Sequence, residues 1–267
     1  MIRGGFGTSL RLVLGGWRWF PLLAVVAGNA AAGLINVGPL RLHGGANAWD
    51  PLVFGGITVQ TFALLTAPAF LIGTSRDMNR SWEHLLCLRL RNRRSWWGTD
   101  ILGLGAAAGL YGLAIGAGTF GLGLAELPFA FTWSALAQSR LAVGSTRLLV
   151  TLHSTPPWTV SLEMLGLLAL GLWLLAVLAR AATLLMKSQW SALALIWVVV
   201  LGQYVLVQMG LASIFPWGPG DQFVYLTHFA TDGGGIPFSW TVEYGLALTL
   251  VGAVVGMAIA QRREWPI

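Results

Sequence analysis

Residues 162–184, "LEMLGLLALGLWLLAVLARAATL", form a continuous apolar run that decides the class of fold. A membrane-spanning helix needs about 20 predominantly apolar residues to cross about 30 Å of hydrocarbon, and this run meets that length. It lacks the alternation of apolar and polar residues that a strand of a membrane barrel shows. Because every backbone polar group must find a partner inside the bilayer, we interpret the run as a transmembrane helix.

The composition extends this interpretation to the whole chain. Hydrophobic residues make up 56% of the 267 residues and charged residues 10%, with a mean hydropathy of +0.71. Such a chain has too few polar side chains to cover a water-soluble globule. We therefore predict an all-α, polytopic membrane protein with a single transmembrane domain. Its six expected spans are residues 19–38, 52–73, 101–123, 162–184, 191–213 and 242–260.

The basic residues predict the orientation of these spans. With six spans, 13 of the 16 Lys and Arg residues fall on the side that holds both termini. The positive-inside rule then places both termini in the cytoplasm. Segments 124–160 and 214–240 are expected to be external. Arg140 and Arg147 make a further span in the first of these unfavourable, and an amphipathic helix on the outer surface is expected there.

Residues with catalytic or metal-binding chemistry are scarce. Asp100, Glu163 and Glu243 each fall at the end of a predicted span, which argues against a proton-coupled pump. The sequence has no Walker loop, no HExxH and no GxSxG motif, and its four histidines lie in predicted loops. The lone Cys87 cannot form an internal disulfide. We therefore expect no catalytic residue, no metal site and no cofactor in this chain.

The segment "SRDMNRSWEHLLCLRLRNRRSWW", residues 75–97, carries six arginines and two acidic residues. Met78, Trp82, Leu85 and Leu86 form an apolar stripe at helical spacing, which predicts an amphipathic helix. Three partners suit such a helix: anionic membrane lipids, nucleic acid, or a groove on a soluble protein. One short basic patch between spans argues against nucleic acid.

The arrangement resembles the permease subunits of type-2 ABC exporters. The resemblance is carried by the amphipathic stretch 2–17, the basic helix beginning "SRDMNRSWEHLL", its continuation "LRLRNRRSWWGTDIL", and the segment "FPWGPGDQFVYLTHFATDGGGIPFSW" before the last span. It implies a half-transporter that pairs with a second permease copy, as a homo- or heterodimer. ABC ATP-binding subunits would bind ATP and Mg, so this chain itself would not be an enzyme. The expected substrate is hydrophobic or amphipathic: a drug, an antimicrobial peptide or a lipid-linked molecule.

The resemblance also implies roles for particular residues. Residues 2–17 would form an interfacial elbow helix, and residues 214–239 an external re-entrant hairpin. The coupling helix, gripped by the ATPase in the bacterial cytoplasm, would present Arg76, Asp77, Met78, Arg80, Trp82, Glu83, Leu85 and Leu86.

Polar residues inside the spans suggest a substrate pathway, although such residues also join helices to one another. The candidates are Asn29, Asn36, Gln60, Gln203, Tyr204 and Gln208. Four glycines in span 3, at positions 105, 109, 112 and 116, predict close helix packing. Tryptophans near the span ends, including Trp96 and Trp97, are expected among the lipid headgroups.

Two other functions fit the same sequence. The chain could be a membrane-anchored sensory or interaction protein that uses the basic segment to recruit a cytoplasmic partner. It could also be a small membrane enzyme with an external site. The side chains that would form such a site are Glu126, His153, Asp221, His228 and Asp232.

Overall fold

The computed structural model describes most of the helical part of the chain. The described residues are 19–41, 45–75, 93–135, 137–138, 155–186, 188–211, 218, 222–224 and 238–262. All regular structure in these residues is helical, with no β-strand among them. The prediction of an all-α fold is confirmed to that extent.

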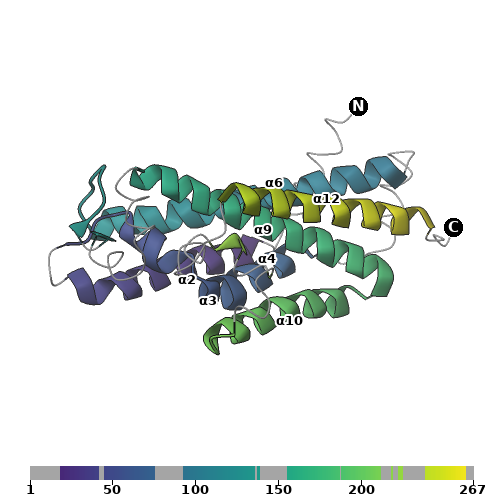
Figure 1. Ribbon diagram of the computed structural model, residues 1–267, viewed down its shortest axis with the longest axis horizontal. Helices are drawn as coiled ribbons and strands as arrows, with labels where there is room; N and C mark the ends of the chain where they lie inside the picture. Colours follow the sequence, from purple (N-terminus) through teal and green to yellow (C-terminus); the bar gives the residue numbers. More distant parts are fainter. Residues whose placement is uncertain are drawn as a thin grey trace.

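Five of the described helices are long and apolar enough to cross a membrane. They are α2 (Trp19–Arg41), α6 (Arg93–Glu126), α9 (Pro157–Met186), α10 (Gln189–Gln208) and α12 (Phe238–Arg262). Figure 1 shows them running along the long axis of the molecule, with α9 between α12 and α10. Five of the predicted spans therefore correspond to continuous helices, although α6 begins eight residues before the predicted residue 101.

The predicted span 52–73 is wrong as a continuous helix. Residues Leu52–Gly56 form a π-helical turn, η2, after which Ile57 and Thr58 leave the helical conformation. The chain then resumes as α3 (Val59–Thr61), a second π-helical segment η3 (Phe62–Thr66) and α4 (Ala67–Thr74). Together α3, η3 and α4 make an apolar helical stretch of 16 residues, shorter than the other five.

The break at Thr58 has a local cause in the side chains that follow it. Thr58 Oγ1 accepts a hydrogen bond from Thr61 N at 3.1 Å, and Thr61 Oγ1 accepts one from Thr58 N at 2.9 Å. This reciprocal arrangement is a capping box, which satisfies backbone donors at a helix start. It lets a new helix begin inside the bundle without leaving those N–H groups unpaired.

Close contact with α2 provides the tertiary cause of the break. A Cβ atom on Gly55 would lie 2.7 Å from Gly33 Cα, and one on Gly33 would lie 2.5 Å from the Pro51 carbonyl oxygen. Only glycine fits on both sides of this crossing. The backbones of α2 and η2 therefore approach as small residues allow in membrane bundles.

The predicted close packing of span 3 is confirmed at three of its four glycines. Gly105 faces Trp173 of α9, and both Gly112 and Gly116 face Leu165. Trp173 Nε1 also donates to the Ile101 carbonyl at 3.0 Å. Gly109 has no atom of another element within 4 Å of a Cβ built there. The α6 glycines thus create a surface into which α9 side chains fit.

Trp96 and Trp97 do not lie among headgroups as expected, because they are only 2% and 1% exposed. Trp97 Nε1 donates to the Ala253 carbonyl of α12 at 2.7 Å, and Gly256 leaves room for its ring. The early start of α6 at Arg93 explains the difference, since it places both rings inside the bundle. Trp158 and Trp190, by contrast, are 50% and 60% exposed at helix starts.

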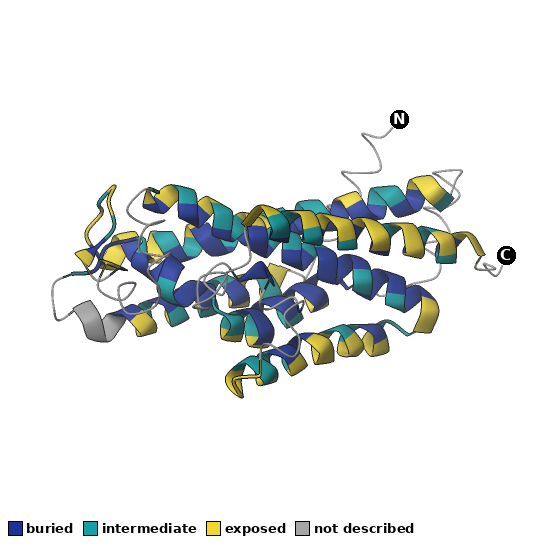
Figure 2. Ribbon diagram, in the orientation of Figure 1, coloured by how far each residue is buried: buried dark blue, intermediate teal, exposed yellow. Residues whose placement is uncertain are grey.

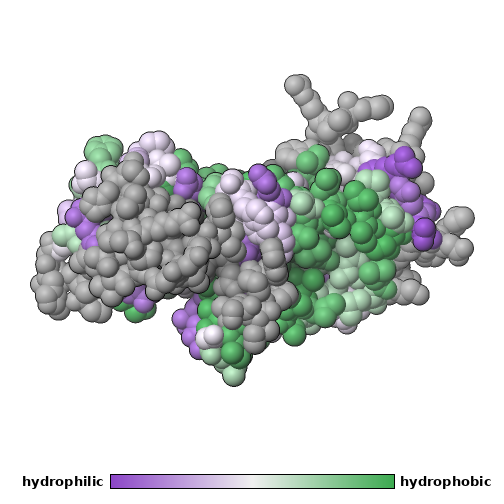
Figure 3. All heavy atoms as spheres, in the orientation of Figure 1, coloured by the Kyte–Doolittle hydropathy of each residue, from purple (hydrophilic) through white to green (hydrophobic). Residues whose placement is uncertain are grey.

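The outer flanks of the bundle are apolar. Figure 2 shows buried positions along the centre of the bundle and exposed positions on the outer sides of α10 and α12. Figure 3 shows hydrophobic side chains over the flank that carries α12, with hydrophilic ones at the end where the chain terminates. Leu250, Val251 and Val254 are each more than half exposed on α12. Such a surface suits a lipid environment.

Candidate functional site

A buried ion pair connects α6 to α9. Arg180 Nε donates to Asp100 Oδ2 at 2.8 Å, and the two residues are 8% and 2% exposed. The Arg180 guanidinium carbon also lies 5.7 Å from the centre of a Trp96 ring. Burying two charges is costly unless they are paired with good geometry, and a cation over an aromatic face gains further attraction.

Sequence reasoning missed this pair. It placed Asp100 just before one predicted span, and Arg180 near the cytoplasmic end of another, span 162–184, without pairing the two. Asp100 lies inside a helix because α6 starts at Arg93 and not near residue 101, and Arg180 lies in the last two turns of α9. The sequence did contain a signal for this pair. Asp100 and Arg180 are an acid and a base that each lie near the end of an apolar run, on the same predicted side of the membrane.

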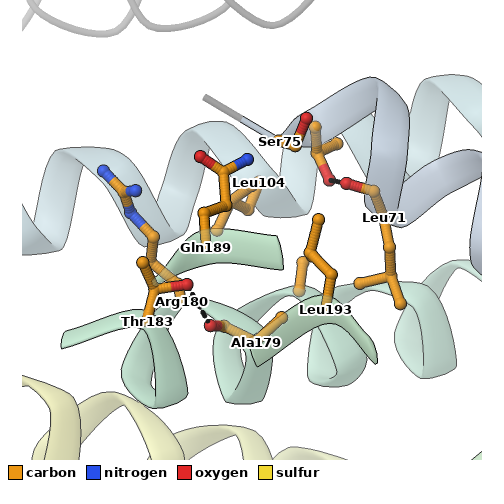
Figure 4. A pocket seen from close by; sticks show the side chains of 10 residues that line it. Leu71, Ser75, Leu104, Ala179, Arg180, Thr183, Gln189 and Leu193 are labelled. Atoms are coloured by element: carbon orange, nitrogen blue, oxygen red, sulfur yellow. Dashed lines mark hydrogen bonds between the residues drawn. The ribbon is translucent and has the colours of Figure 1, made fainter. Parts of the chain in front are cut away.

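The ion pair borders a small cavity of about 30 Å³ where four elements meet. Figure 4 shows side chains from α4, α6, α9 and α10 converging on it. They are Leu71, Thr74, Ser75, Leu104, Ala176, Ala179, Arg180, Thr183, Gln189 and Leu193. We refer to this space as the polar cavity.

The polar cavity offers both acceptors and a donor. The hydroxyls of Thr74, Ser75 and Thr183 donate to carbonyls of their own turns at 2.7, 2.6 and 2.8 Å, which leaves their oxygens able to accept. Gln189 Nε2 is buried and has no hydrogen-bond partner among the described residues. A space of this size holds about one water molecule or one small polar group.

The polar cavity lies at the end of the bundle that we call the basic end. This end contains the ends of α4, α9 and α12 and the starts of α6 and α10. Arg93 Nη1 donates to the Gln261 carbonyl at 2.8 Å, which ties the start of α6 to the end of α12. Among the described arginines, Arg93, Arg94, Arg180 and Arg262 lie at this end and Arg41 lies at the other.

The opposite end is held by a second polar cluster that sequence reasoning did not find. Asp50 is fully buried and accepts hydrogen bonds from Asn47 N at 2.7 Å and Ser134 Oγ at 2.9 Å. Asn47 Nδ2 donates to the Thr132 carbonyl at 2.8 Å, and Trp49 Nε1 to the Ala130 carbonyl at 2.9 Å. The loop before η2 is thus fastened to the segment after α6. The run "NAWDP" gave a signal, since Asn and Asp before Pro are typical of helix starts.

The residues predicted to line a substrate pathway are spread over the bundle. Asn29 is 1% exposed and donates to Thr66 Oγ1 at 3.1 Å, so it joins α2 to η3. Gln203 is 2% exposed and packs against Gly218. Asn36, Gln60 and Gln208 are exposed, and Tyr204 is partly buried. None of the six lines the polar cavity. The hydrogen bond from Asn29 to Thr66 agrees with the other role considered for polar residues inside spans, which is to join helices to one another.

The predicted coupling helix lies outside the described residues, and so does the elbow helix 2–17. This covers Arg76, Asp77, Met78, Arg80, Trp82, Glu83, Leu85 and Leu86. Of the five residues suggested for an external enzyme site, only Glu126 is described, and it is exposed at the end of α6. The described part of the chain holds no group of three or more His, Cys, Asp or Glu residues that could bind a metal.

Comparisons with protein-family models, with curated proteins and with solved structures found no match for this chain.

Proposed function

We propose that this chain is the permease subunit of an ATP-driven exporter of the type-2 ABC kind. It moves a hydrophobic or amphipathic substrate across the bacterial cytoplasmic membrane, with both termini in the cytoplasm. The charge difference between the two ends of the bundle supports this orientation, and the five long apolar helices together with the shorter stretch Val59–Thr74 support six crossings. ATP and Mg are bound by a separate ATP-binding subunit, and a second permease copy completes the transport pathway.

One observation carries the proposal: the basic connection 76–92 joins a residue that lines the polar cavity to the helix that holds Asp100. Ser75, its preceding residue, lines the cavity, and Arg93, its following residue, opens the helix that holds Asp100. A force on this connection reaches α4 and α6 directly. It reaches α9 through the ion pair of Asp100 with Arg180. Coupling of this kind needs a contiguous packed network, which these contacts provide.

The broken segment between Asp50 and Thr74 supports a moving part. Helical elements that interrupt their hydrogen bonding inside a bundle absorb changes in backbone angle, as hinges do. The pieces after the break, α3 through α4, lead straight into the basic connection. In the proposed cycle these pieces shift against η2, which stays fastened to α2 by the Gly33 and Gly55 contact.

The proposal is tested by replacing residues 78–86 with a Gly/Ser linker of the same length. We expect the wild-type chain to copurify in detergent with an ATPase expressed from a neighbouring gene, and the variant to lose it. Smaller changes, Trp82→Ala and Glu83→Arg, should separate ATP hydrolysis from transport in proteoliposomes while leaving the helix content unchanged. A linker of equal length at residues 141–149, on the opposite side, is the matched control and should keep the ATPase bound.

Two results would contradict the proposal. One is a wild-type chain that copurifies with no ATPase, and the other is a linker variant that still transports. Capture of a cytoplasmic protein without ATPase activity through residues 78–86 would support the sensory or interaction protein instead.

A further inference from the structure

An apolar groove of about 170 Å³ lies between α4 and α10. Its walls include Pro68, Leu71 and Ile72 from α4 and Trp190, Leu193 and Trp197 from α10. An engineered apolar cavity of about 150 Å³ binds benzene, so a groove of this size accommodates a comparable length of hydrocarbon chain. We call it the α4/α10 groove.

The α4/α10 groove adjoins the polar cavity, because Leu71 and Leu193 line both. On α10, Gln189, Leu193 and Trp197 are spaced four apart and form one stripe. On α4, the apolar wall gives way to Thr74 and Ser75. Both walls therefore change from apolar to polar in the same direction, towards the basic end.

The depth of the groove follows from the length of α10. The helix has 20 residues, Gln189–Gln208. At 1.5 Å per residue it is about 30 Å long, which equals the thickness of the hydrocarbon layer. Gln189 and the exposed Trp190 then lie at the membrane surface, where tryptophan is favoured. Leu193 and Trp197 lie about 6 and 12 Å deeper, at the level of the acyl chains.

The inner end of the groove is fixed in place. Trp197 Nε1 donates to the Ala63 carbonyl of η3 at 3.1 Å. This bond holds α10 against the broken segment below the groove. At the outer end, the buried Gln189 Nε2 offers a donor that no described residue accepts. The groove thus has apolar walls joined by the Trp197 bond at its inner end, and a buried hydrogen-bond donor in the adjoining polar cavity.

We propose that the α4/α10 groove binds one acyl chain of a glycerophospholipid from the leaflet at the basic end. The chain lies along Leu193 and Trp197. A glycerol ester oxygen at the head of that chain enters the polar cavity and accepts a hydrogen bond from Gln189 Nε2. This site depends only on the membrane setting of α4 and α10, and it stands whether or not the chain transports a substrate.

The test uses the full chain reconstituted in liposomes of phosphatidylethanolamine and phosphatidylglycerol. A trace of phosphatidylethanolamine with a photoactivatable diazirine in mid-chain is the probe, and labelled peptides are mapped by mass spectrometry. We expect residues 190–197 and 68–72 to be labelled at least about fivefold above the exposed face of α12 around Leu250 and Val254, although 68–72 are less exposed than that face.

Two variants separate the groove from the general lipid contact of α10. Ala194→Phe fills the groove from an exposed position and should lower the labelling of 68–72 about fivefold. Val198→Phe is the matched control, because Val198 is 59% exposed on the same helix and does not line the groove. Gln189→Leu should reduce labelling, and Gln189→Asn should restore part of it.

Two outcomes would overturn the proposal. Labelling that follows exposure equally on α10 and α12, and that Ala194→Phe leaves unchanged, would mean that only surrounding bulk lipid touches the groove. Loss of groove labelling together with a disulfide between two copies of Ala194→Cys, in a Cys87→Ser background, would mean that a second copy covers it.

Discussion

Removing one partner of the Asp100 and Arg180 pair should destabilise the bundle more than any surface change. Asp100→Asn removes the negative charge that lies against the Arg180 guanidinium, which is only 8% exposed. Hydrogen bonds to charged groups contribute about 1.5–3 kcal/mol, and breaking a buried ion pair on one side costs about 3–5 kcal/mol. Because an Asn oxygen at this position still accepts from Arg180 Nε, we expect a loss near the lower limit, about 3 kcal/mol.

The double variant Asp100→Leu with Arg180→Met should behave differently. It removes both charges and refills the space with apolar side chains, a change that is often neutral for buried pairs. Reversible unfolding in mixed micelles, followed by tryptophan fluorescence and helical circular dichroism, gives the free energy for each variant. The coupling energy from the four-variant cycle of Asp100→Leu and Arg180→Met should be at least about 2 kcal/mol.

The control for this cycle is Arg262→Met, which removes an exposed arginine at the same end of the bundle. It should change the free energy of unfolding by less than about 0.5 kcal/mol. Additive single changes of less than about 1 kcal/mol each would show that the pair does not hold α6 to α9. The proposed transmission of force from the basic connection 76–92 through α6 to α9 would then have no ion pair to carry it.

Three further predictions use the same unfolding assay. Gly256→Ala should cost about 1–3 kcal/mol, because the new Cβ would overlap the Trp97 ring, whereas Gly202→Ala, with open space around it, should stabilise α10 by about 0.5–1 kcal/mol; equal effects would argue against the Trp97 contact. Thr58→Ala should cost about 1 kcal/mol by removing the capping acceptor, and an increase in stability would show that the break at Thr58 is not maintained by its cap. Asp50→Ala should cost about 1–3 kcal/mol and speed hydrogen exchange at Asn47 N, while unchanged exchange there would rule out the Asp50 cluster as the fastening of this end.

The long helices were predictable from the sequence because their signal is local. An apolar run such as 162–184 can satisfy its backbone only as a helix in a bilayer, so composition and length are enough. The ends were less predictable. The start of α6 at Arg93 depends on Trp96 and Trp97 finding room against Ala253 and Gly256, which are more than 150 residues away in the chain.

The remaining differences arise because hydropathy does not distinguish lipid from a neighbouring helix. An apolar side chain is accommodated by acyl chains as well as by another helix, so apolarity does not reveal which of the two it contacts. For Trp96 and Trp97 the sequence therefore indicated only a position near a span end, and the headgroup region was the expectation. The break in the second segment depends on Gly33 and Gly55 meeting across two elements. The pairing of Asp100 with Arg180 depends on the register of α6 against α9, which no single window of sequence contains.

The interrupted second segment has a consequence for the order in which the protein assembles. As long as it stands alone in the bilayer, an unbroken helix would satisfy its backbone better than the bend at Ile57 and Thr58. Contact with Gly33 of α2, and with Thr119 of α6 beside Gly56, rewards the bent form. We therefore expect the segment to insert as a straight helix during synthesis and to bend only after α6 has packed against it. The last step of assembly would then be a rearrangement in the second segment and not the insertion of the last helix.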